Sequence, residues 1–145
     1  PAQHGFPDTF FVFDEILEIF FPFDSPKRLS KSSLSALEKA LKDSSPSVRI
    51  EIANTLIRNG QSKDALSTLI GELNHENLIV VAHAARTIEL LGEKAKLAVP
   101  AMEICLKRAY AVRPPDLSPV IVLPGDQDMA MFVGFSCYAF LQKVK

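Results

Sequence analysis

The chain has 145 residues, of which 48% are apolar and 23% are charged, and its net charge is −1. These values are typical of one soluble globular domain with a sizeable core. The near-neutral balance argues against a nucleic-acid binder, because phosphate binding needs a basic excess. No apolar run approaches the ~20 residues that would span a bilayer.

A phenylalanine-rich stretch comes first, and residues 9–21 have the apolar spacing of a helix. Asp8 or Thr9 is a candidate N-cap, and Pro22 ends the helix. Apolar side chains occur on more than one side of it, so we expect either two neighbouring elements or another domain to cover it. The lack of a basic leading segment argues against a signal peptide.

A repeat with a period of 32 residues follows. Residues 43–60 match residues 75–92 position by position, with small or apolar residues in register. Such an echo predicts a repeat architecture, with one helix pair over 33–60 and a second over 62–92. The matched positions are Val48 and Val80, Ile52 and Ala84, Ala53 and Ala85, Leu56 and Ile88, and Gly60 and Gly92.

Capping residues divide each pair into two helices. In the first pair, Ser35 and Glu38 have capping-box spacing in a helix expected over 33–43. Ser45 and Pro46 are the expected start of the next helix, which Gly60 closes in a left-handed conformation. In the second pair, the predicted N-caps are Ser62 and Asn77, and Gly92 ends the pair.

The third pair, residues 93–145, is interrupted by a proline-rich insertion over 112–127. Its first helix starts near Leu97, with Pro100 early enough to be tolerated. The pattern resumes after the insertion, where four residues occupy the repeat positions: Val133, Cys137, Tyr138 and Leu141. The apolar centre of the insertion is a candidate partner-facing segment that either folds back over the helices or docks on a partner; it consists of Val120, Ile121, Val122 and Leu123.

Asp43 followed by Val48 and Arg49 resembles the HEAT-repeat family, with a short period as in phycobilin-lyase-type repeats. The resemblance implies an all-α fold: one domain, 1–145, built as an α-α superhelix of about three helix pairs after an extra N-terminal helix. In that family the inner face usually binds protein. Val81 and Gly134 stand where the family usually has Arg.

The order FDEILEIFFPFD, a polar linker and the repeats also resembles the helical C-terminal extension of bacterial sulfatases. This resemblance implies an appendage of a periplasmic or extracellular enzyme. The chain lacks the C/S-x-P-S-R motif of those enzymes, because Cys105 precedes Leu-Lys-Arg and Cys137 precedes Tyr-Ala-Phe. Both cysteines lie in helical patterns, where we expect them buried as small hydrophobes, with a disulfide as the alternative.

No nucleophile motif and no phosphate-binding glycine loop is present, so we predict no catalytic, cofactor-binding or metal-binding residue. His75-Glu76 resembles the iron-binding pairs of deoxyhypusine hydroxylase. A metal site needs several converging ligands, however, and a solvated turn accounts better for a single pair. The alternative function is a small enzyme or metal-binding protein on this scaffold, either lyase-like or hydroxylase-like.

Four residues are candidates for a mildly basic inner surface, with ordinary solvated charge as the alternative: Arg49, Arg58, His83 and Arg86. We also expect Asp43 and Arg49 to bridge neighbouring helices. The sequence thus predicts a non-catalytic helical-repeat module without cofactor, whose partner is a protein or a neighbouring domain.

Overall fold

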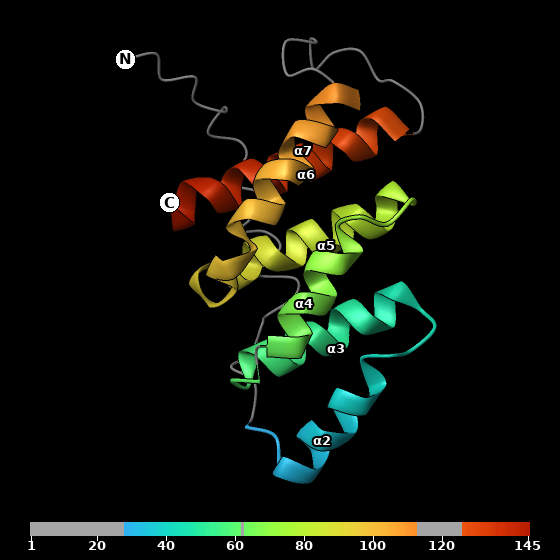
Figure 1. Cartoon of the computed structure of the whole chain (residues 1–145), viewed down its shortest axis with the longest axis vertical. Coiled ribbons are helices and arrows are strands. Elements are labelled where there is room, and N and C mark those ends of the chain that lie inside the picture. The colour runs from blue at the N-terminus through green and yellow to red at the C-terminus, as the bar shows by residue number, and fades with distance from the viewer. Residues whose placement is uncertain (1–27, 62, 113–125) are drawn as a thin grey trace, which may run out of the picture.

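The structure, a computed structural model, describes residues 28–61, 63–112 and 126–145. These residues form six α-helices and one 3₁₀ helix, with no strand among them (Figure 1). The predicted helix over 9–21, the predicted cap Ser62 and most of the predicted insertion lie outside the described residues. The helices are α2 (Lys31–Ala40), α3 (Pro46–Arg58), α4 (Lys63–Glu72), α5 (Leu78–Leu91), η1 (Gly92–Ala98), α6 (Val99–Val112) and α7 (Asp126–Val144).

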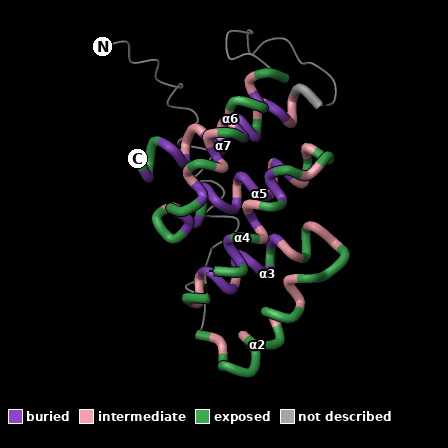
Figure 2. The backbone as a smooth tube through the Cα atoms, in the orientation of Figure 1, coloured by how far each residue is buried: buried purple, intermediate pink, exposed green. Residues whose placement is uncertain are grey.

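The helices stack in pairs. The second helices, α3, α5 and α7, pack against one another in that order, while α2 packs on α3, α4 on α3 and α5, and α6 on α7 (Figure 1). One continuous core runs from Ile50 in α3 to Val144 in α7, and buried segments lie where the helices face each other (Figure 2). The predicted all-α stack of helix pairs is therefore confirmed.

The first described helix begins earlier than predicted. Ser30 is the N-cap of α2, and its hydroxyl accepts a hydrogen bond from the Ser33 amide at 3.2 Å. The capping box expected at Ser35 and Glu38 is therefore wrong, because both residues lie inside the helix. A serine-rich stretch offers several capping side chains in a row, and spacing alone does not choose between them.

The start of α3 is as predicted, with Ser45 at the N-cap and Pro46 in the first turn. The Ser45 side chain makes no capping bond, however; instead its backbone amide donates to Asp43 Oδ1 at 2.8 Å. Asn77 caps α5 as predicted, because its Oδ1 accepts from the Ile79 amide at 2.9 Å.

Gly60 ends α3 in the left-handed region, with φ of +86°. The Gly60 amide donates to the Ile57 carbonyl at 3.1 Å and the Gln61 amide to the Leu56 carbonyl at 2.9 Å. These two bonds form a Schellman motif, which satisfies carbonyls that the helix end leaves open. Gly92 follows α5 with φ of +53°. Both predicted glycine ends are confirmed.

The core stripe of α3 differs from the repeat alignment at its first position. Val48 was expected in the stripe but is 42% exposed, whereas Ile50 is fully buried. Ile52, Ala53 and Leu56 are buried as predicted. The buried residues of α3 therefore begin at Ile50, two residues later than predicted.

The third pair forms across the insertion. Leu97, the predicted start of its first helix, lies in η1 and is 83% exposed, while Pro100 is the second residue of α6. Helix α7 begins at Asp126, inside the predicted insertion. The α6–α7 contact is close at Gly134, where a Cβ would lie 3.3 Å from the Tyr110 ring.

Both cysteines are free and buried, as predicted. Cys137 Sγ lies 3.9 Å from Met102 Sδ in the α6–α7 interface. The neighbouring Cys105 thiol, together with burial, raises the pKa of Cys137. The side chain therefore stays neutral at physiological pH and packs as an apolar group.

Arg49 links the first two helix pairs. Its Nε donates to Glu72 Oε1 of α4 at 2.6 Å, and its Nη1 donates to the carbonyls of Asp43 and Ser44 at 2.8 and 3.2 Å. The hydrogen bond with Glu72 raises the pKa of Arg49. The Glu72 side chain is only 8% exposed, so without Arg49 its carboxylate would be buried without this hydrogen bond.

Two glycines that are open to solvent test the role of backbone conformation. We expect Gly60→Ala to lower the free energy of unfolding by ~1–2 kcal/mol, because an L-residue is strained in the left-handed region. Gly71→Ala is the matched control: its Cβ also meets nothing within 4 Å, but the residue is helical. It should raise stability by ~0.5–1 kcal/mol. Urea unfolding measures both, and equal effects would contradict this role of Gly60.

A second comparison tests the Arg49–Glu72 pair. We expect Arg49→Met to cost ~1–3 kcal/mol in urea unfolding, because Glu72 loses a charged hydrogen bond while it stays buried. The double variant Arg49→Met/Glu72→Met should recover most of that loss. Lys39→Met, at an exposed position of α2, is the control and should change stability by less than ~0.5 kcal/mol. Strictly additive effects of the single variants Arg49→Met and Glu72→Met on the free energy of unfolding would argue against a direct interaction.

Candidate functional site

The second helices present a surface on the side opposite their buried stripes, here called the inner face. Its residues recur at helical spacing along α3, α5 and α7 and are exposed or half-buried. Positions 51 and 83 are 32 residues apart, as are 58 and 90, so the repeat brings equivalent positions to adjacent helices. The inner face consists of Glu51, Arg58, Ile79, His83, Arg86, Leu90, Phe132 and Lys143.

Contacts between polar side chains join the inner face across successive helices. His83 Nε2 of α5 lies 2.8 Å from Glu51 Oε1 of α3. Arg86 Nη1 donates to Glu89 Oε2 at 2.7 Å, and Lys143 Nζ of α7 lies 3.6 Å from Glu89 Oε1. Glu89 is buried beneath the face, with a side chain that is 2% exposed. These side-chain contacts connect α3 to α5 and α5 to α7.

Three of the four predicted basic candidates share the inner face, namely Arg58, His83 and Arg86. Arg58 Nε donates to Asn54 Oδ1 at 3.0 Å, and burial lowers the pKa of Arg58. Arg49 lies on the opposite side of α3 from Arg58 and pairs with Glu72 of α4. The structure therefore separates Arg49 from the surface to which the sequence assigned it, since its guanidinium satisfies a buried carboxylate.

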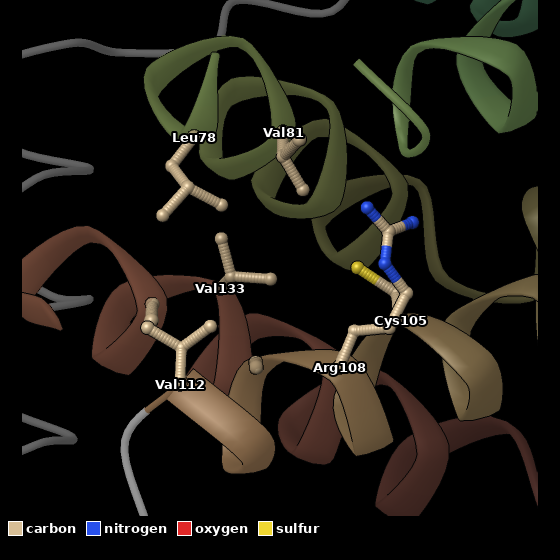
Figure 3. Close-up of a pocket in the computed structure, with 8 residues that line it drawn as sticks. Leu78, Val81, Cys105, Arg108, Val112 and Val133 are labelled. Carbon is tan, nitrogen blue, oxygen red and sulfur yellow. The ribbon is translucent and has the colours of Figure 1, made fainter. Parts of the chain in front are cut away.

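The other four candidates, residues 120–123, lie outside the described residues. A small cavity of about 70 Å³ lies between α5, α6 and α7, near Val112, the last residue of α6 (Figure 3). It is mostly apolar and far smaller than the ~300–1,000 Å³ of small-molecule sites. Its lining residues are Leu78, Val81, Cys105, Arg108, Ala109, Val112, Ala130 and Val133.

The arginine beside this cavity has a structural partner. Arg108 Nη1 donates to the Leu73 carbonyl at 3.2 Å and to Asn74 Oδ1 at 3.0 Å, at the turn that follows α4. A cation at a helix C-terminus satisfies open carbonyls and favours the helix dipole. The contact therefore ties α6 to α4, as Arg49 ties α3 to α4.

The sequence reasoning missed the apolar members of the inner face. Leu90 and Phe132 are 48% and 52% exposed, and Ile79 is 64% exposed. The repeat does contain a signal for Leu90, because it is the position equivalent to Arg58. Phe132 lies beside the predicted core position Val133, one residue off the stripe.

The predicted turn histidine has a local role. His75 Nδ1 accepts a hydrogen bond from the Asn77 amide at 3.0 Å, in the turn before α5. Among residues 28–61, 63–112 and 126–145, no three His, Cys, Asp or Glu side chains gather as a metal site would require. In the same parts of the chain, no helix combines the length and the apolar character needed to cross a membrane.

Comparison with known proteins gives one match. The family model of HEAT repeats matches residues 30–113, more than half of the chain. The matched range contains α2 to α6 and stops before α7. Neither the curated proteins nor the solved structures contain a match, so the resemblances to phycobilin-lyase-type repeats and to the sulfatase extension stay predictions. HEAT repeats generally mediate protein–protein interaction. From its helix pairs and this match, the chain belongs to the HEAT-repeat family.

Proposed function

We propose that this chain is a non-catalytic interaction module whose inner face binds a protein partner or a neighbouring domain. The observation that carries the proposal is the exposure of Leu90 and Phe132 on the same face as Arg58 and Arg86. Aromatic and arginine side chains are enriched at protein interfaces, whose fully buried centre is also more apolar than the rest of the surface.

The inner face is also suited to binding because its helices are linked before any partner arrives. The three helices share one apolar core, and the Glu51–His83 and Glu89–Lys143 contacts link them further at the surface. A preorganised surface loses less conformational entropy on association. The basic and the exposed apolar side chains of the inner face favour a partner with both acidic and apolar side chains.

The sequence resemblance to sulfatase extensions favours the interdomain form of this proposal, in which the partner is a catalytic domain of the same parent chain. The repeats would then dock on that domain through the inner face. The sequence of the parent chain tests this form directly: a C/S-x-P-S-R motif upstream of Pro1 supports it, and a parent chain without any enzymatic domain excludes it.

Substitutions on opposite sides of the stack test the proposed face. We expect Leu90→Asp and Phe132→Asp each to weaken partner retention by about 10- to 100-fold, as loss of a buried apolar anchor costs ~1–3 kcal/mol. Ile104→Asp is the matched control, because Ile104 is 58% exposed on α6 rather than on a second helix. Retention from an extract of the source cells, quantified by mass spectrometry, is the measurement.

Far-ultraviolet circular dichroism should show the same helix content for all three variants, since the replaced side chains are about half exposed or more. A partner that is lost only with Ile104→Asp would place binding on the first helices of the pairs, α2, α4 and α6, and would overturn the proposal.

A further inference from the structure

The first 26 residues differ in charge from the rest of the chain. They contain five of its 17 acidic residues and none of its 16 basic residues. They also contain seven of its ten phenylalanines. The helix predicted over 9–21 has apolar side chains on several sides, and such a helix is stable in water only when another surface covers it.

The chain enters the described structure beside the inner face. The Leu29 amide donates to Asn59 Oδ1 at 3.1 Å, which fixes the backbone at the C-terminal end of α3. An open groove of about 510 Å³ lies at this point. Its lining includes three cations and no carboxylate: Arg28, Leu29, Leu34, Arg58, Asn59, Gly60 and Lys94. An acidic segment that leaves from Arg28 therefore starts in a basic groove.

The dimensions allow the segment to cover the face. Packed helix axes lie 8–10 Å apart, so the distance from α3 across α5 to α7 is about 20 Å. A helix over 9–21 would be about 20 Å long at 1.5 Å per residue. The linker 22–27 can span up to about 20 Å when extended. The segment can thus reach from the basic groove to α7.

We propose that the acidic, phenylalanine-rich segment 9–24 docks in cis on the inner face and competes there with the protein partner. Its carboxylates pair with Arg58, Lys94 and Lys143, and its phenylalanines cover Leu90 and Phe132. This inference rests on the proposed function, because it assigns an intramolecular occupant to the same face.

Photo-crosslinking of the full chain tests the docking. p-Benzoylphenylalanine replaces Phe13, the protein is irradiated at low micromolar concentration, and the linked peptides are identified by mass spectrometry. We expect intramolecular links to α5 or α7. The yield should fall at least five-fold in Arg58→Glu/Lys94→Glu and stay unchanged in Lys39→Glu/Lys107→Glu, which reverses two exposed charges on α2 and α6.

Links confined to α2, α4 or α6, links between chains only, or no links to protein would each overturn the inference. Links between chains only would mean that a second copy of the chain receives the segment. Partner retention is measured separately: neutralising the segment with Asp14→Asn/Glu15→Gln/Glu18→Gln should raise it several-fold. If crosslinking fails while Leu90→Asp still loses the partner, the proposed function stands and only the intramolecular occupant is excluded.

Discussion

The structure depends on one constraint: no helix of a pair can bury its apolar side without the next pair. Helix α2, at the first end of the described stack, has no buried residue, whereas α5 in the middle has seven. Ala53, Ala84 and Ala85 are fully buried, and their small side chains let the second helices approach closely. In such repeat proteins, stability arises from contacts between neighbours, so α5, packed on both sides, contributes most to cooperativity.

Two carboxylates, those of Glu72 and Glu89, are buried in this stack. Glu72 depends on Arg49, and Glu89 depends on Arg86 and Lys143. A buried charge costs free energy unless it is paired, and replacing such a pair by apolar residues is often neutral for stability. These carboxylates therefore affect the relative positions of the helices more than the net stability. A paired carboxylate fixes two helices relative to each other, and Glu89 does so directly beneath the inner face.

The sequence predicted the features that follow from period and backbone geometry. The helix pairs, the left-handed Gly60 and the Asn77 cap each depend on a few neighbouring residues, so local spacing identifies them. For the inner face, the sequence pattern identified Arg58, His83 and Arg86, but it did not separate Arg49 from them. The sequence pattern does not distinguish Arg49 from Arg58. In the structure, Arg49 forms a hydrogen bond with Glu72 of α4, which lies 23 residues later in the chain. The exposure of Phe132 likewise depends on how α7 packs on α5 and α6, a long-range contact that the repeat pattern does not contain.

The repeat gives all three second helices the same face, and substitutions between repeats give that face a direction. At one set of equivalent positions α3 has Arg58, α5 has Leu90 and α7 has Lys143; at another, α5 has Ile79 and α7 has Phe132. The exposed apolar side chains of the face, Ile79, Leu90 and Phe132, therefore lie on α5 and α7, whereas its members on α3 are the charged Glu51 and Arg58. A partner whose acidic end lies near Arg58 and whose aromatic end lies near Phe132 would fit in one orientation only, because the reverse orientation would bury a carboxylate against a phenyl ring.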